Sequence, residues 1–303
     1  MNSLTFVLSK TNTLQSMKKT FLALAIVLSG TTFAQELPMP SPTATLQQRI
    51  GLTDFTIVYS RPGAKDRQVF GDLVPYNEMW RTGANGNTTI QFNTDVEFAG
   101  TTVSPGKYSL FTIPGEGEWT IVLNKKTDLW GTGGYDETMD VARFNVKADK
   151  NGMTETFTID FTDIRTESAN LTLSWEKTQV NIPVKVEVSK IAIENIEEAL
   201  SSAEADAKWR VYRNAANYYH NNNIEADKAL EYIDMSIKSK NDSWYSYWLK
   251  AEIQADMNNY KEAIASAQKA KEIGQKEAKA SGSEFSYAAM IDKGIAEWKA
   301  KKS

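Results

Sequence analysis

The hydrophobic pattern divides the chain into two parts with different periods. From about residue 45 to residue 188, apolar and polar residues alternate, as where Leu171, Leu173 and Trp175 enclose Thr172 and Ser174. Side chains of a β-strand point to opposite faces in turn, so each such run predicts a strand with one buried face. After about residue 189, apolar residues recur with the helical period of 3.6. The pattern therefore predicts a β-rich part followed by a helical part.

Turn residues separate the alternating runs. Asn151-Gly152 lies between two such runs and is the strongest hairpin signal in the chain. Pro183 interrupts the last run, and proline cannot donate a hydrogen bond to a neighbouring strand, so an edge strand is predicted there. Nine or ten short strands with such turns predict an antiparallel β-sandwich, with a closed barrel as the alternative.

The helical part is predicted to form a series of amphipathic helices. Asp242 and Ser283 stand where N-cap residues are expected before two of them. The predicted ranges are 191–200, 203–219, 225–238, 243–256, 260–279 and 284–302.

An internal repeat crosses these helices. Aromatic and small residues recur after 34 or 35 residues: Trp209, Tyr212 and Ala216 are followed by Trp244, Tyr247 and Ala251, and the small residues Ala229 and Ser236 by Ala263 and Ala270. This period is typical of tetratricopeptide repeats, although the loop glycine and the terminal proline of the full consensus are missing. Unrelated helical hairpins are the alternative. The fold class predicted is α+β with two domains, a sandwich over residues 35–189 and a TPR-like helical domain over residues 190–303.

The N-terminal segment has the order of a secretory signal peptide. Met17-Lys18-Lys19 is basic, residues 21–29 are apolar, and Thr32-Phe33-Ala34 supplies small residues for cleavage. The apolar run is too short to cross a bilayer, which needs about 20 residues. We expect Met17 to be the initiator, cleavage after Ala34 and a periplasmic or secreted protein without a membrane span. No cysteine follows the apolar run, so no lipoprotein anchor is expected.

Composition excludes several kinds of chemistry. Among its 303 residues the chain has no cysteine and a single histidine, His220. Disulfide scaffolds, thiolate metal sites and cysteine nucleophiles are therefore ruled out, and the usual general base is scarce. The formal net charge of −4, without a basic cluster, argues against a nucleic-acid partner. We predict no catalytic residue set, no metal site and no cofactor.

One long connection, from Ser60 to Asn85, departs from the pattern because it is rich in both glycine and large apolar residues. Loops of this length are often functional. Arginine binds carboxylate or phosphate in a bidentate manner, and aromatic faces bind sugars or planar groups. The connection and its flank therefore predict a pocket for an anionic or glycan-like ligand, with candidate residues Tyr59, Arg61, Arg67, Tyr76, Trp80, Arg81 and Asn85.

The alternative interpretation of this connection is architectural. The three arginines would then pair with nearby carboxylates, of which Asp66, Asp72 and Glu78 are available. Trp80 would be a core residue that anchors the connection to the sheet.

The sequence of the β-rich part resembles a known family. The segments that carry the resemblance are YSRPGAKDRQVFGDLVPYNEMWRTGANGNTTI, AGTTVSPGKYSLFTIPGEGEWTIVLN and LTLSWEKTQVNIPVKVEV. They are similar to the DUF2911 family over roughly residues 38–189. The resemblance implies a β-rich exported domain, often followed by a helical TPR-like tail, and it implies no activity.

Three functions remain open from the sequence. The first is a non-enzymatic exported binding or scaffold protein, with a glycan or carboxylate ligand in the sandwich and a protein or peptide partner on the helices. The second is a hydrolase that cleaves envelope polysaccharide or peptide through carboxylates. The third is a purely structural envelope protein.

Overall fold

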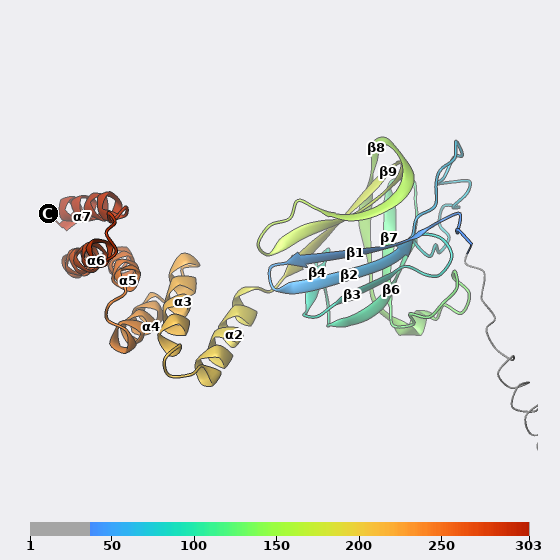
Figure 1. The fold of residues 1–303 in the computed structure, drawn as a ribbon. Helices are drawn as coiled ribbons and strands as arrows, with labels where there is room; N and C mark the ends of the chain where they lie inside the picture. The colour runs from blue at the N-terminus through green and yellow to red at the C-terminus, as the bar shows by residue number, and fades with distance from the viewer. Residues whose placement is uncertain (1–36, 303) are drawn as a thin grey trace, which may run out of the picture.

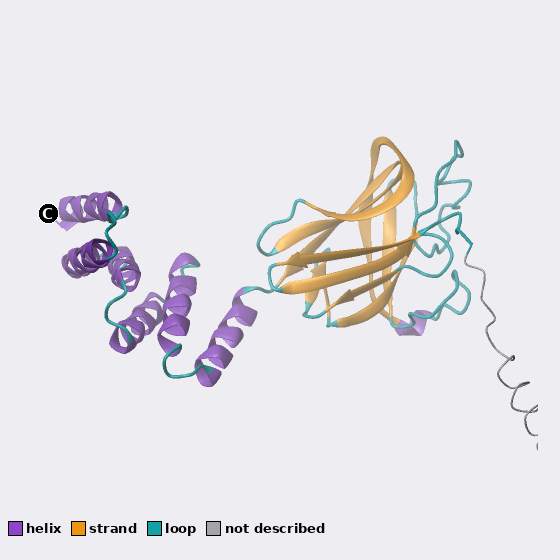
Figure 2. Ribbon diagram, viewed as in Figure 1, coloured by secondary structure: helices purple, strands orange, loops and turns teal. Residues whose placement is uncertain are grey.

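The computed structural model describes residues 37–302, so the predicted signal peptide lies outside the described residues. Strands and helices occupy separate parts of the chain and opposite ends of the molecule (Figures 1 and 2). The strands are β1 (Thr43–Ile50), β2 (Thr53–Ser60), β3 (Thr89–Phe92), β4 (Val96–Phe98), β5 (Thr101–Val103), β6 (Gly106–Ile113), β7 (Glu118–Asn124), β8 (Asp140–Thr162) and β9 (Ser168–Val186), with a short 3₁₀ turn, η1 (Glu137–Met139), before β8.

The strands form an antiparallel sheet that folds into two facing layers. Its order is β1-β2-β3-β6-β7-β8-β9-β4-β5. The first part of β8 pairs with β7 and its later part pairs with β9, so this long strand belongs to both layers. Residues of β2 pack against the later part of β8: the ring centroids of Phe55 and Phe161 lie 5.0 Å apart, and those of Tyr59 and Phe157 lie 5.9 Å apart. This is the antiparallel sandwich that the alternating pattern predicts.

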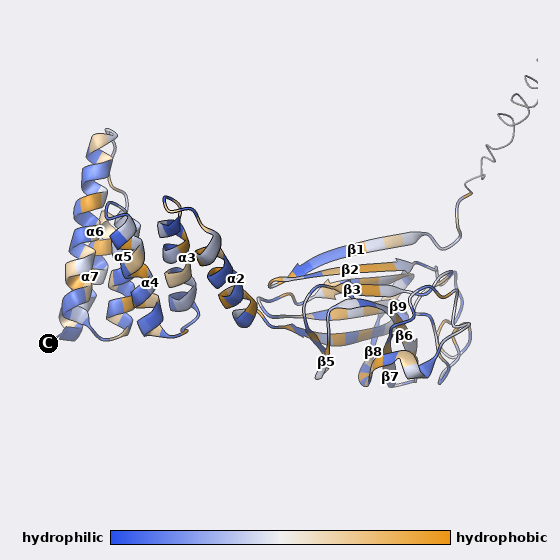
Figure 3. Cartoon of the chain, turned by 90° about the horizontal axis from the view of Figure 1, so that it is seen from below, coloured by the Kyte–Doolittle hydropathy of each residue, from blue (hydrophilic) through white to orange (hydrophobic). Residues whose placement is uncertain are grey.

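Alternation places the apolar residues of each strand between the layers. Leu171, Leu173 and Trp175 of β9 are all buried, and so are Trp119 and Ile121 of β7. Hydropathy alternates along the same strands in Figure 3. Burial of these large side chains supplies most of the hydrophobic stabilisation of the sandwich.

Two predictions about the strands, a hairpin at Asn151-Gly152 and an edge strand at Pro183, are wrong. Asn151-Gly152 makes no hairpin but lies within β8, where the register with β9 shifts between Lys150 and Thr154. The extra residues are accommodated as an irregularity in a continuous strand. Pro183 does not mark an edge strand, since β9 lies between β8 and β4. Pairing with β8 already ends at Val180, so the missing N–H of the proline costs no ladder hydrogen bond on that side.

Six helices follow the sandwich: α2 (Ser189–Ser202), α3 (Lys208–Asn221), α4 (Ala226–Ser239), α5 (Trp244–Asp256), α6 (Tyr260–Ala280) and α7 (Ala288–Lys302). The repeated small residues occupy equivalent places in two helix pairs. Ala216 of α3 and Ala251 of α5 are both fully buried, as are Ala229 of α4 and Ala263 of α6. Small residues at these positions let the paired helices pack closely. No helix within the described range is long and apolar enough to cross a membrane.

The helix starts differ from the prediction in detail. Ser243, rather than Asp242, caps α5, because its side chain accepts a hydrogen bond from the backbone N–H of Ser246. Ser283 caps no helix, because α7 begins only at Ala288. A loop from Ser281 to Tyr287 intervenes, and it carries Phe285 into the packing between α5, α6 and α7.

Candidate functional site

The β2–β3 connection (residues 61–88) lies at the end of the sandwich away from the helices (Figure 1). Trp80 exchanges two backbone hydrogen bonds with Thr112 of β6, so the connection extends the sheet locally. Farther along, the backbone N–H of Asn87 donates to the carbonyl of Leu129 in the β7–β8 loop. The connection is therefore held on both sides by hydrogen bonds rather than lying free on the surface.

Trp80 is a core residue at the centre of an aromatic cluster. Its ring stacks on that of Trp175, with centroids 5.8 Å apart, and contacts Phe70 and Phe157 edge to face. Its indole N–H donates to the carbonyl of Gly83 at 3.0 Å. Only 8% of Trp80 is exposed. Trp80 is therefore a core residue that anchors the connection to the sheet, as the architectural interpretation predicts.

The three arginines of the connection donate to neutral oxygen atoms. Arg61 reaches the carbonyl of Phe157 and the hydroxyl of Thr158. Arg67 donates through Nε and Nη2 to the carbonyls of Ala64 and Gly63. Arg81 donates through Nη1 to the carbonyl of Asn85 at 3.3 Å. Within residues 37–302, none of the three arginines forms an ion pair. The architectural pairs with Asp66, Asp72 and Glu78 are therefore not formed.

A cavity of about 280 Å³ opens beside Trp80. Arg67 and Arg81 both border it, so the structure brings together two of the three arginines and the tryptophan. Glu78 is the one carboxylate among the described residues that line it. The remaining lining residues are mostly apolar or small: Ser41, Pro62, Leu73, Val74, Pro75, Met79, Gly83, Ala84 and Trp175.

The backbone around Arg81 is tightly constrained. Thr82, the next residue, has φ of 55°, which is unusual for a β-branched side chain. Its hydroxyl lies within hydrogen-bond distance of both the carbonyl of Trp80 and the hydroxyl of Thr112, and these contacts hold it in place. On the other side, a Cβ built on Gly131 would lie 2.8 Å from Nη1 of Arg81. The guanidinium of Arg81 is thus fixed between its own loop and the β7–β8 loop.

A second cavity, of about 560 Å³, lies on the other side of Arg67. Tyr76 lines this cavity rather than the first one. It shares the lining with Glu176 and Lys177 of β9, and the Glu176 carboxylate accepts a hydrogen bond from the backbone N–H of Val69. Arg67 is therefore the residue common to the two cavities.

The other candidate residues lie outside both cavities. The hydroxyl of Tyr59 donates to the carbonyl of Ile159 and accepts from the N–H of the same residue, so it joins the two layers. The side chain of Asn85 donates to Ser41 and Ser60 and ties the N-terminal segment to the connection. Arg61 lies against β8, as described above.

Sequence reasoning missed the residues that other parts of the chain bring to the site. Trp175 is recognisable as an inward-facing strand residue, but no local signal connects it with Trp80. Ser41 lies in the segment before β1 and had no signal of its own. Both reach the cavity only because the sheet folds into two layers.

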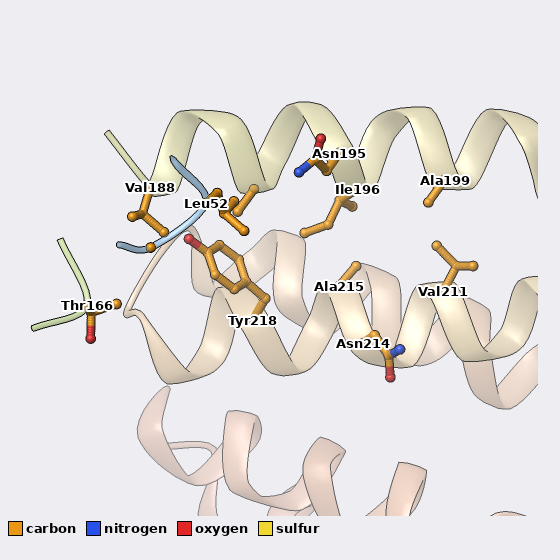
Figure 4. Close-up of a pocket in the computed structure, with 12 residues that line it drawn as sticks. Leu52, Thr166, Val188, Asn195, Ile196, Ala199, Val211, Asn214, Ala215 and Tyr218 are labelled. Carbon is orange, nitrogen blue, oxygen red and sulfur yellow. The ribbon is translucent and has the colours of Figure 1, made fainter. Parts of the chain in front are cut away.

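A third, apolar cleft of about 480 Å³ lies between the sandwich and the first two helices (Figure 4). Leu52 from the β1–β2 turn and Val188 stand at one end of it, while Ile196 and Ala199 of α2 face Ala215 and Val211 of α3. None of the described residues that line this cleft carries a charge. Helix α2 contains no fully buried residue, because α3 covers its apolar face only in part.

The described residues contain no group of three or more His, Asp or Glu side chains that could hold a metal ion. A family model described as "Protein of unknown function (DUF2911)" matches residues 41–184, a span that includes every residue lining the cavity beside Trp80. No curated protein matches the chain.

Proposed function

Because residues 41–184 belong to the DUF2911 family, whose description assigns no activity, we propose a function from the geometry: this is an exported binding protein whose cavity beside Trp80 holds a small ligand with a carboxylate group. The observation that carries the proposal is that Arg67 and Arg81 border one cavity and have no carboxylate partner within residues 37–302. Nη1 of Arg67 and both Nε and Nη2 of Arg81 are left for a ligand. Charge-assisted hydrogen bonds from guanidinium groups are the strong ones in recognition of carboxylates.

The shape and the lining of the cavity support a small ligand of mixed character. Its volume is near the lower end of the range for small-molecule sites, about 300 to 1,000 Å³. Leu73, Val74 and Met79 add apolar side chains to a lining that also holds the two arginines. A sugar acid has both a carboxylate and an apolar ring face, so uronates are the ligand class that we propose.

Binding rather than catalysis fits the charged groups at the site. Glycoside hydrolysis through carboxylates needs two acids about 5 to 10 Å apart in one cleft. Among the described residues that line this cavity, Glu78 is the single acid. The lone histidine, His220, belongs to α3 in the helical part.

The remaining parts of the proposal concern export and the helices. The signal-peptide order of residues 17–34 supports a periplasmic or secreted location. The TPR-like repeat, with its equivalent buried small residues in α3 to α6, supports docking of a protein or peptide partner, because such arrays present extended binding surfaces.

The test is a calorimetric titration of the protein with galacturonate, with neutral galactose as the comparison ligand. We expect galacturonate to bind and galactose to bind at least about tenfold more weakly. Arg81→Gln and Arg67→Gln should each weaken galacturonate binding, whereas Arg165→Gln, an exposed arginine outside both cavities, should not. Since Arg81 makes one long hydrogen bond within the chain, its loss should change stability by no more than about 1 kcal/mol. Equal binding of the two sugars would contradict the proposal.

A further inference from the structure

A groove of about 500 Å³ lies where the N-terminal ends of α3 and α5 meet the C-terminal part of α6. We propose that this groove binds an acidic segment of a partner protein, in which a carboxylate side chain stands next to an apolar one. The inference rests on the proposed function of the helical part and names the chemistry of its partner. The lining residues are Trp209, Arg213, Lys240, Asp242, Ser243, Trp244, Tyr245, Ile273, Lys276, Glu277 and Ala280.

Positive charge is concentrated around one indole at the edge of the groove. The charged groups of Arg210, Arg213 and Lys240 lie 5.2, 5.1 and 4.8 Å from the ring centroid of Trp209. The quadrupole of the ring attracts each cation, but the cations repel one another. Of these three side chains, only Lys240 forms an ion pair within the described residues, with Asp242 at 3.7 Å. An incoming carboxylate would relieve this repulsion.

Arg213 is positioned for such a carboxylate in advance. Its guanidinium lies over the rings of both Trp209 and Tyr245, at 5.1 and 5.7 Å from their centroids. Its single hydrogen bond within the described part of the chain is a 3.4 Å contact with the side chain of Asn214. Because the two rings already restrict the side chain, less conformational entropy is lost when a ligand binds. The guanidinium N–H groups remain available for a bidentate contact.

Lys276 of α6 supplies a further cation to the lining of the groove. It is exposed on α6, and no carboxylate of the described chain pairs with it. Trp244, Ile273 and Ala280 also line the groove and give it apolar surface beside these cations. A partner segment can therefore pack an apolar side chain in the groove while Arg213 and Lys276 bind its carboxylates.

The acids of the groove argue for a peptide rather than a nucleic acid. Asp242 and Glu277 both line it, and a dense row of phosphates would be repelled by them. Separate carboxylates on a peptide can approach Arg213 and Lys276 while they avoid these two acids. The size of the groove also fits a few side chains rather than a duplex.

The experiment measures binding of short labelled probes to the full chain by fluorescence anisotropy. The main probe is the fluorescein-labelled peptide GSEFDELSG, and the comparison probe carries Gln and Asn in place of its Glu and Asp. We expect the acidic peptide to bind about tenfold more tightly than the amide peptide, with an affinity that falls as salt is added. Lys276→Gln and Arg213→Gln should each weaken it about five- to tenfold. Lys279→Gln, on the same helix but outside the groove, is the matched control and should bind as the unmodified protein does.

Several results would overturn the inference. Equal affinity for the two peptides, equal loss in Lys279→Gln, or tighter binding of a labelled nine-nucleotide oligothymidylate would each do so. Arg213→Gln removes two ring contacts that pack the helices together. Lys276→Gln removes no side-chain hydrogen bond or ion pair within the described residues, so it decides the outcome if the melting temperature of the first variant falls. Loss of peptide binding in Arg81→Gln would place the peptide in the sandwich and refute the groove. Galacturonate binding by the sandwich is measured separately and is independent of all these outcomes.

Discussion

The indole rings of Trp80 and Trp175 stack with their planes 18° apart and their centroids 5.8 Å apart. Trp80 belongs to the β2–β3 connection and Trp175 to β9, so this contact joins the connection to the opposite layer of the sandwich. Trp175 also donates its indole N–H to the carbonyl of Glu155 in β8. The wall of the proposed ligand cavity is therefore part of the hydrophobic core.

This contact predicts a large loss of stability when Trp175 is truncated. Trp175→Ala should lower the free energy of unfolding by about 3 to 5 kcal/mol, because it leaves a cavity beside the three aromatic rings that it contacts, those of Phe70, Trp80 and Phe157. Urea unfolding followed by circular dichroism measures the change. Trp130→Ala is the control: that side chain is 71% exposed, and its loss should change stability by less than about 0.5 kcal/mol. Similar losses in the two variants would contradict the assigned packing.

Much of the fold could be predicted because it follows from local pattern. The alternation of Leu171, Leu173 and Trp175 places each of them in the core, and the 3.6 period locates all six described helices after the sandwich. The strand ends were harder to predict. Asn151-Gly152 favours a tight turn locally, yet pairing along β8 on both sides of it keeps the chain extended, so tertiary contacts overrule the turn preference.

The candidate site could be predicted only in part, for a physical reason. Arg67, Arg81 and Trp80 lie in one unusual connection, so their composition alone marks them. Their partners are backbone carbonyls, and every residue carries one, so no sequence pattern shows which carbonyl an arginine will reach. The same limit explains why Arg61, similar in type and place, lies on β8 instead of in the cavity.

The cap of α5 gives a second prediction. Ser243→Ala should destabilise the helical part by about 1 kcal/mol, because its side chain satisfies the backbone N–H of Ser246. Asp242→Ala removes an exposed side chain that makes one long ion pair and no cap, so its effect on thermal unfolding should be smaller. The reverse order would show that Asp242 caps the helix, as the sequence first suggested.

Replacement of Gly274 in α6 by alanine should destabilise the protein, although such a replacement usually stabilises a helix. Replacing glycine with alanine inside a helix normally stabilises it by about 1 kcal/mol. Here an added Cβ would clash with the ring of Phe285, which packs directly on the glycine. Gly274→Ala should therefore destabilise the protein, by about 1 to 3 kcal/mol. In the double variant with Phe285→Ala the added penalty should disappear, and thermal unfolding of the four combinations measures this coupling.

Glu252 predicts a pH dependence of stability in the helical part. Burial raises the pKa of this carboxyl from 4.5 to about 7; the neighbouring Asp256 adds to the rise, and a hydrogen bond with Trp248 opposes it. The folded protein therefore holds a proton that the unfolded chain releases between about pH 4.5 and pH 7. The stabilisation linked to this proton is complete below pH 4.5 and is lost as the pH rises through 7.

Glu252→Gln tests that dependence because the amide keeps the shape of the protonated acid and cannot ionise. Urea unfolding at pH 5 and pH 8 gives the free energy of unfolding of the variant and of the unmodified protein. We expect the difference between the two proteins to shift in favour of the variant from pH 5 to pH 8. Glu262→Gln, on the exposed start of α6, is the control and should show no such difference. A constant difference between Glu252→Gln and the unmodified protein at the two pH values would contradict a raised pKa.

Gly131 offers a way to disturb the ligand cavity without altering any side chain that lines it. Its φ of 77° favours glycine, and a Cβ there would meet Nη1 of Arg81 at 2.8 Å. Gly131→Ala should therefore displace the Arg81 guanidinium and weaken galacturonate binding by about three- to tenfold, since a fixed guanidinium is what the proposed site relies on. Gly133→Ala is a close control two residues away, where the nearest atom to an added Cβ is 3.8 Å distant, and it should bind as the unmodified protein does. If calorimetry finds both variants unaffected, Arg81 does not hold the ligand. If both lose binding equally, the β7–β8 loop acts as a whole and not through its contact with Arg81.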